Sequence, residues 1–231
     1  MQHLSTVDAI VAVDGVVTRR LAAAAPAYPL SEACERNREP ILALLKPILQ
    51  HRQRVIEIGA GTGQHARYFA QQLPHLCWQA SDAGLSSCPT LSELATCLAQ
   101  AQLPNLPPPW LVDVTQRPWP PALAQYRPDA AFTANTLHIM SWTAVAAMFA
   151  GLGNSLPASA PFIVYGPFRY AGRHTSDSNQ RFDRSLRQRD AASGVRDIES
   201  VLETATASGF ALEADHAMPA NNRTLVFRRQ A

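Results

Sequence analysis

The feature that most constrains this chain is a short apolar run that ends in a glycine-rich loop and leads directly into a helical pattern. Residues 55–58 read Val-Ile-Glu-Ile, residues 59–63 carry three glycines, and residues 64–72 are predicted to form a helix. Strand and helix patterns continue to alternate after this unit. Such alternation is typical of α/β proteins, in which helices cover both faces of a parallel sheet.

The remaining patterns complete a sheet of seven strands. Strands are predicted at 55–58, 76–80, 110–112, 129–134, 162–165, 210–215 and 224–228. Helices are predicted at 64–72, 90–102, 143–156 and 197–208, and around Phe182 and Leu186. The last two strands have no helix between them, so they are predicted to pair antiparallel. The sheet is therefore predicted to be mostly parallel, with one antiparallel closing strand.

The residues before the sheet divide into two parts. Residues 1–30 are predicted to be an appendage, with a hairpin around Asp14-Gly15 and a linker at 22–29. A two-stranded hairpin is marginal alone, so it is predicted to dock on the main domain or on a partner chain, as in a homodimer. A frayed terminus is the alternative. The main domain is predicted to span 31–231, with Asn37 as the N-cap of its first helix.

Composition excludes several classes of protein. The 231 residues are 47% hydrophobic and 16% charged, which excludes wholesale disorder, and a net charge of +2 gives no strong nucleic-acid footprint. No run of about 18 apolar residues indicates a membrane span. The four cysteines form no C-x-x-C pair, which argues against a zinc site or a disulfide framework. A reduced, cytoplasmic compartment without a bound metal is predicted.

The loop at 57–63 reads E-x-G-x-G-x-G and indicates a nucleoside site. Gly59 permits a tight turn, and Gly61 and Gly63 allow a ligand to approach the backbone closely. The dinucleotide fingerprint G-x-G-x-x-G would place a glycine at position 64, where this chain has Gln64. The pattern is instead that of class I methyltransferases, which predicts S-adenosylmethionine (SAM) as the cofactor. A glycine turn with only a structural role is the alternative.

Carboxylates at two further strand ends complete the predicted cofactor site. Asp82 follows Gly61 by 21 residues, close to the spacing of about 20 expected for a ribose-binding carboxylate. Asp113 ends the third strand and is predicted to accept from the adenine amino group, directly or through Thr115; a turn-forming role is the alternative. The predicted cofactor-binding residues are Glu57, at the cationic methionine end, and Gly59, Gly61, Thr62, Gly63, Asp82, Asp113 and Asn135.

Two histidines are candidates for the catalytic base. His138 follows the fourth strand, where donor and acceptor should meet, and an imidazole titrates near neutral pH. His174 opens a polar turn in the stretch 166–196, which carries a local excess of four positive charges. A pocket-wall histidine and a solvated helix face with an Asp183–Arg187 pair are the respective alternatives.

Several motifs together resemble the methyltransferase-like protein 26 family. The resemblance covers residues 31–229 and rests on the segments around 31–42, 61–65, 78–82, 134–139, 165–168, 174–175, 194–197 and 218–222. It implies a Rossmann-like class I SAM-dependent methyltransferase fold and leaves the acceptor unnamed. Family motifs without a donor role are predicted to form an acceptor pocket under the N-terminal helix; they contain Glu35, Arg36, Asn37, His174, Asn221 and Asn222.

These observations predict a methyltransferase for a small, unidentified acceptor. Because Arg36 and Arg169 are predicted to clamp an anion, the acceptor is expected to carry a negative charge. His138 ranks ahead of His174 as the base. The alternatives are a methyltransferase for RNA or protein, and a SAM-binding subunit or sensor without catalysis.

Overall fold

The computed structural model describes residues 31–84 and 90–231, so the predicted hairpin and linker lie outside the described residues. Seven strands form the main sheet, in the order β3-β2-β1-β4-β5-β10-β9. They are β1 (Arg54–Ile58), β2 (Cys77–Asp82), β3 (Trp110–Leu111), β4 (Ala130–Ala134), β5 (Pro161–Gly166), β9 (Phe210–Met218) and β10 (Asn222–Arg229). β10 pairs antiparallel with both β5 and β9, while the other pairs are parallel. The predicted seven-stranded sheet with one antiparallel strand is confirmed.

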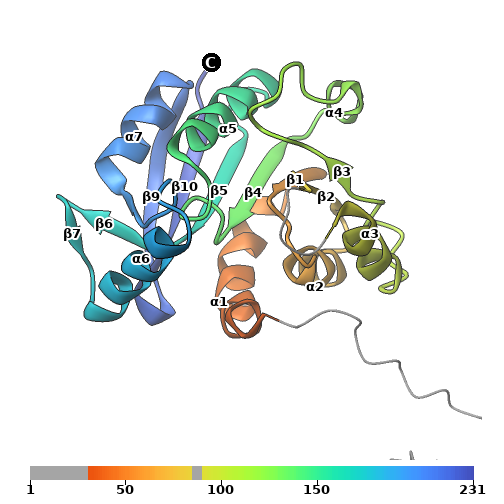
Figure 1. Cartoon of the computed structure of the whole chain (residues 1–231). Coiled ribbons are helices and arrows are strands. Elements are labelled where there is room, and N and C mark those ends of the chain that lie inside the picture. The colour runs from red at the N-terminus through yellow and green to blue at the C-terminus, as the bar shows by residue number, and fades with distance from the viewer. Residues whose placement is uncertain (1–30, 85–89) are drawn as a thin grey trace, which may run out of the picture.

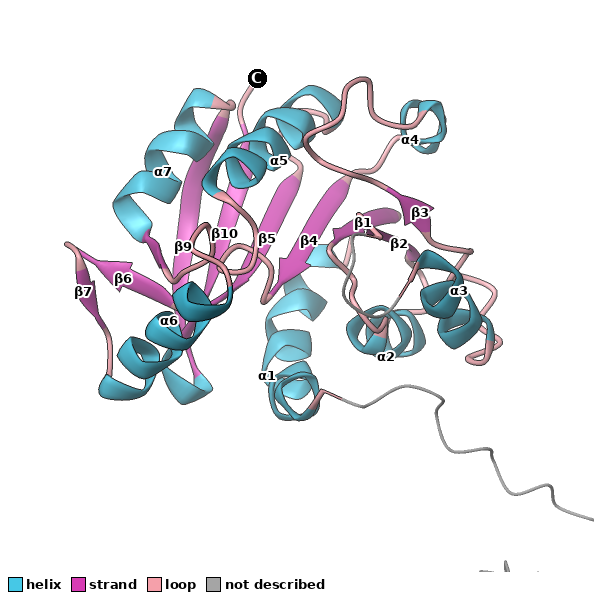
Figure 2. Ribbon diagram, viewed as in Figure 1, coloured by secondary structure: helices cyan, strands magenta, loops and turns pink. Residues whose placement is uncertain are grey.

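Helices cover both faces of this sheet, as Figures 1 and 2 show. One face is packed by α1 (Glu32–Leu49), α2 (Gln64–Gln72) and α3 (Leu91–Ala99), and the other by α4 (Pro121–Tyr126), α5 (Trp142–Ser155) and α7 (Ile198–Ala207). Each face has its own apolar core. Trp78 and Phe132 anchor the first core, and Phe149 and Phe162 anchor the second.

The first helix begins five residues before the predicted N-cap. Ser31 caps α1 by accepting from the Cys34 backbone N–H, and Glu32 and Glu35 in the first turn suit the positive end of the helix dipole. Asn37 lies inside the helix and is buried. The N-cap prediction for Asn37 is therefore wrong, because Ser31 satisfies the free N–H group and the side chain of Asn37 is used for a tertiary contact.

The stretch of chain between β5 and α7 forms a small additional substructure. It consists of α6 (Asp177–Arg189) and a three-stranded sheet in the order β7-β6-β8. Its strands are β6 (Phe168–Tyr170), β7 (Arg173–His174) and β8 (Arg196–Asp197). The helix was expected from Phe182 and Leu186, whereas strands of two or three residues are too short to leave a readable alternation.

The strand order reverses between β1 and β4, which are neighbours in the sheet although five elements separate them in sequence. In open α/β sheets, ligands bind outside the carboxyl ends of the strands at such a point. Within the described ranges, no helix combines the length and the apolar character needed to cross a membrane.

Gly153 tests the close packing of α5 against the segment after α7. A methyl group on Gly153 would overlap the backbone carbonyl oxygen of Ser208. In an open helix, Gly→Ala stabilises by about 0.5–1 kcal/mol. We expect Gly153→Ala to destabilise the protein by about 1–3 kcal/mol instead, because a backbone atom must move.

Urea denaturation measures this change, and Asn154→Ala, at the exposed neighbouring position of the same helix, is the control. A Gly153→Ala protein as stable as the control would contradict the packing described for α5.

Candidate functional site

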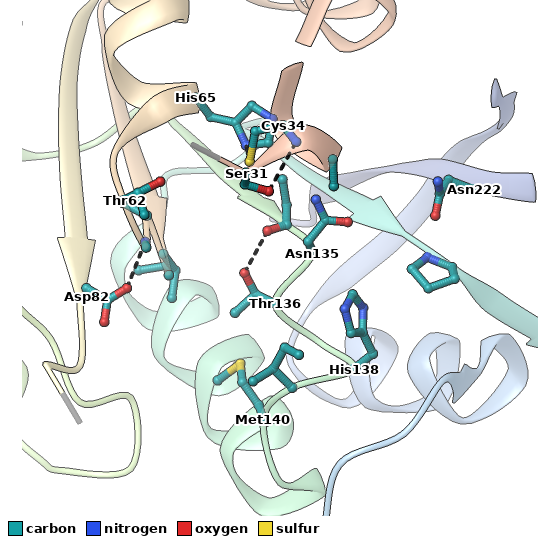
Figure 3. Close-up of a pocket in the computed structure, with 18 of the residues that line it drawn as sticks. Ser31, Cys34, Thr62, His65, Asp82, Asn135, Thr136, His138, Met140 and Asn222 are labelled. Atoms are coloured by element: carbon teal, nitrogen blue, oxygen red, sulfur yellow. Dashed lines mark hydrogen bonds between the residues drawn. The ribbon is translucent and has the colours of Figure 1, made fainter. Parts of the chain in front are cut away.

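A cavity of about 650 Å³ opens where the strand order reverses. Ile58 at the end of β1 and Ala134 at the end of β4 line its floor. The glycine loop after β1, the first turn of α1, the loop after β4, α6 and the turn before β10 supply the walls (Figure 3). Segments far apart in sequence therefore meet at one edge of the sheet.

The glycine loop is held to the end of β2. The backbone N–H groups of Gly59 and Ala60 donate to the Ser81 carbonyl at 3.0 Å each, and that of Gly61 donates to the Asp82 carboxylate at 2.9 Å. Gly61 has φ +54°, and an added Cβ would meet no atom within 4 Å. At Gly59, φ +74°, the Cβ would collide with Thr136. The loop is thus a left-handed turn with an unobstructed backbone at Gly61.

Asp82 stands where a ribose-binding carboxylate was predicted, at the end of β2 and in the cavity wall. Its other oxygen accepts from the Gly84 N–H at 3.1 Å. Each carboxylate oxygen can accept two hydrogen bonds, so both keep capacity for hydroxyl donors. Gly61 and Thr62 line the cavity beside it.

Asp113 has a different environment. Its carboxylate accepts from the Thr115 N–H at 2.9 Å and from the Thr115 hydroxyl at 2.7 Å, and these bonds lower the pKa of Asp113. The cavity wall is formed by the neighbouring Val112 and Val114. The contacts of Asp113 are those of a turn-forming residue, the alternative that the sequence left open, and the third strand presents apolar side chains to the cavity.

Glu57 lies behind the cavity wall. The side chain is fully buried on β1 and accepts from the Trp78 indole N–H at 2.7 Å. Burial raises the pKa of Glu57 to about 7, the indole bond opposes the rise, and the charge of Asp82 adds to it. Glu57 is therefore not among the residues that line the cavity, and Trp78 binds its carboxylate; its role at the cationic methionine end of SAM stays a prediction.

The first turn of α1 contributes residues that the sequence did not single out. Ser31 and Cys34 line the cavity together with His65 of α2. The His65 ring donates from Nε2 to the Asn37 amide oxygen at 2.7 Å, and the Cys34 sulfur lies 4.0 Å from His65 Nδ1. Burial lowers the pKa of His65 to about 4 and raises that of the Cys34 thiol, so both groups are neutral at pH 7. Asn37 reaches the site only through His65.

The loop after β4 carries polar groups into the other half of the cavity. Asn135, with φ +58°, and Thr136 line it, followed by His138. The buried His138 ring packs edge-to-face on Phe182 of α6, with centroids 5.2 Å apart. Burial, with the charges of Arg196 and Arg189, lowers the pKa of His138 to about 4, and no hydrogen bond to a described residue contributes to this shift. His138 is therefore a neutral imidazole at pH 7.

Segment 193–196 holds the loop that carries His138. It binds four consecutive backbone carbonyls, those of residues 137 to 140. Gly194 N–H donates to the His138 carbonyl at 2.8 Å, and the Ser193 hydroxyl donates to that of Ile139 at 2.7 Å. Arg196 donates through Nε to Leu137 at 2.9 Å and through Nη2 to Met140. We call this arrangement the carbonyl clamp; it assigns Arg196 a structural role that its charge alone did not indicate.

The predicted acceptor residues are only partly brought together. Asn222 lines the cavity, while Asn221, with φ +57°, forms the turn and accepts from Asn179 of α6 through its carbonyl at 3.0 Å. Glu35 is paired with Arg38 at 2.7 Å and accepts from Gln64 at 3.1 Å. His174 lies in β7, 3.5 Å from the carboxylate of Asp183.

The two predicted anion clamps also lie outside the cavity lining. The Arg36 side chain is 69% exposed and pairs with Glu32 at 3.2 Å, and Arg169 lies 3.8 Å from the Asp197 carboxylate. Only the first turn of α1 reaches the cavity; the rest of the helix packs on the sheet face. The acceptor pocket predicted under the N-terminal helix is therefore covered by that turn alone among the residues of α1, and Arg36 is an exposed residue outside the cavity lining.

The buried carboxylate of Glu57 makes stability depend on pH. Because its pKa in the folded protein lies above the 4.5 of an unperturbed glutamate, its contribution is complete below pH 4.5 and is lost as pH rises through about 7. We expect the free energy of unfolding of the wild-type protein to fall by an amount on the order of 3 kcal/mol between pH 5 and pH 8 because of Glu57. Glu57→Gln, which keeps an acceptor for Trp78, should remove this fall.

Urea denaturation at the two pH values measures the difference between wild type and variant. Glu203→Gln, at an exposed position on α7, is the control and should change nothing. A constant difference between wild type and Glu57→Gln at both pH values would contradict the assignment.

The fold is similar to that of solved methyltransferases. The structure of an O-methyltransferase family protein from Burkholderia thailandensis matches with a TM-score of 0.71 and 12% identity, over 87% of this chain and 58% of that one. Human N-acetylserotonin methyltransferase in complex with SAM matches with 0.66 and 14%, over 87% and 53%. N,N-8-amino-8-demethyl-D-riboflavin dimethyltransferase from Streptomyces davawensis matches with 0.64 and 15%, over 85% and 55%.

At these identities the likeness shows the fold, which is that of the Rossmann-like class I methyltransferases, and the chain spans little more than half the length of these structures. The family comparison is more direct. Residues 28–229 match the model of a family described as "Protein of unknown function (DUF938)", and this chain therefore belongs to the DUF938 family.

Proposed function

We propose that this protein transfers a methyl group from SAM to a small-molecule acceptor bound in the cavity. The observation that supports this most is the glycine loop, which is tied to Asp82 while the backbone at Gly61 faces open space. The resemblance to the methyltransferase-like protein 26 family points to the same chemistry. A cavity of about 650 Å³ has room for a nucleoside and a second small molecule.

The residues present fit SAM at one half of the cavity. Asp82 would accept from the ribose hydroxyls, Val112 and Val114 would contact the adenine, and the loop at Gly61 and Thr62 would lie along the ligand. SAM supplies an electrophilic methyl group on a positively charged sulfur. The chain then has to orient the acceptor in line with that methyl group and exclude water.

His138 is proposed as the group that accepts the acceptor's proton. Its imidazole is neutral at pH 7, and the carbonyl clamp holds the loop that carries it. A low pKa does not prevent this role, because an oxygen becomes strongly acidic as it forms a bond to the methyl carbon. A rigid loop gives the precise geometry that methyl transfer requires.

Calorimetric titration tests the donor half. Wild-type protein should bind SAM and S-adenosylhomocysteine. Asp82→Asn should weaken both by roughly 10- to 100-fold, because each lost hydrogen bond to a charged group is worth about 1.5–3 kcal/mol.

Asp113→Asn is the matched control, since it changes the carboxylate at the next strand end, whose partner is Thr115. Its affinity for both ligands should stay within about twofold of wild type. Absence of SAM binding by the wild-type protein, or equal losses in the two variants, would count against the proposed function.

A further inference from the structure

The half of the cavity away from Asp82 has apolar walls. Figure 3 shows Asp82 and Thr62 on one side, His138 and Asn222 on the other, and Met140 between the two sides, below Thr136. Ile139, Met140, Pro167 and Phe182 line this second half. Ile139 and Phe182 remain 51% and 37% exposed. Apolar surface exposed inside a concave site is typical of a ligand-binding wall.

This half of the cavity holds no positive charge among the described residues. No arginine or lysine is among the described residues that line the cavity, and the one carboxylate among them, Asp82, lies in the other half. The two arginines whose charges act on His138 have partners outside the cavity: Arg196 donates to the loop carbonyls, and Arg189 donates to the Ser185 carbonyl at 3.4 Å. An anionic acceptor would lose its hydration without gaining a cationic side chain as a partner, so an uncharged one is favoured.

The polar groups that remain are neutral. Asn135, Asn179, Asn222 and His138 can each exchange hydrogen bonds without carrying a charge at pH 7. The Asn179 amide is already used in part, because it donates to the Thr175 hydroxyl and to the Asn221 carbonyl. His138 supplies the imidazole of this half, and the ring of Phe182 packs edge-to-face against it.

We propose that this half of the cavity binds an uncharged aromatic molecule that carries a hydroxyl group, with its ring against Phe182 and its hydroxyl toward His138. The proposal rests on the proposed function, because it takes the other half as the donor site. An aromatic ring fits walls made of a phenyl ring, a proline and a methionine, which all make favourable contacts with π-systems. In the transfer, the hydroxyl oxygen bonds to the methyl carbon, the carbon–sulfur electron pair stays on sulfur, and the hydroxyl proton passes to His138.

Two probes of matched size test the proposal in protein saturated with S-adenosylhomocysteine. One is 2-naphthol, which is uncharged at pH 7, and the other is 2-naphthoate, which is an anion. Calorimetry should show that 2-naphthol binds at least tenfold more tightly than 2-naphthoate. Equal binding of the two probes, preference for the anion, or no binding of either would overturn the proposal.

Variants then locate the probe. Phe182→Ala should weaken 2-naphthol at least fivefold, and Leu212→Ala, which truncates a side chain of the same 37% exposure on β9, should not. His138→Phe keeps a ring but removes the proton acceptor, and it should also weaken 2-naphthol at least fivefold. Unchanged 2-naphthol affinity in both site variants would overturn the proposal.

The affinity for S-adenosylhomocysteine distinguishes a failure of the proposed function from a failure of the acceptor assignment. If the wild-type protein does not bind it, the proposed function fails. If the protein binds S-adenosylhomocysteine but does not prefer 2-naphthol over 2-naphthoate, only the acceptor assignment fails. Phe182→Ala should keep the wild-type affinity for S-adenosylhomocysteine, which also shows that this variant is folded.

Discussion

The site depends on one constraint, the parallel pairing of β1 with β2 on one side and β4 on the other. Because β4 is placed beside β1 rather than after β3, the connections leave the sheet in opposite directions and a crevice opens between them. The register carries Ser81 to the end of β1, where its carbonyl receives the N–H groups of Gly59 and Ala60. The turn of the glycine loop therefore follows directly from the strand pairing.

The parts of the molecule that could be predicted are those with a local cause. Sheet strands show runs of apolar residues because both faces are buried, and the glycine loop shows three residues that tolerate positive φ. Asp82 could be placed because the spacing from the loop to the next strand end is set by one helix and one strand. All seven strands of the main sheet and the helices α2, α3, α5 and α7 were found in this way.

The rest depends on contacts between distant segments, which no local pattern records. Asn37 has the chemistry of a cap, but His65 takes its side chain. Asp82 and Asp113 both follow a predicted strand, but only Asp82 lines the cavity, while Asp113 binds Thr115. In the sequence, the arginines of the stretch 166–196 indicate an anion site. In the structure, Arg169 and Arg187 pair with carboxylates, and Arg196 donates to backbone carbonyl oxygens. Charge composition could not distinguish these two uses of a guanidinium group.

The carbonyl clamp has a consequence for how such a site can be altered. Four peptide groups of residues 137–140 take their hydrogen bonds from the insertion rather than from the sheet. The loop that carries His138 and the stretch 166–196 that carries Phe182 therefore form one structural unit, although more than forty residues separate His138 from Phe182 in sequence. Exchanging either piece alone with a relative would leave unpaired carbonyls beside the cavity, whereas exchanging both together would keep these carbonyls paired.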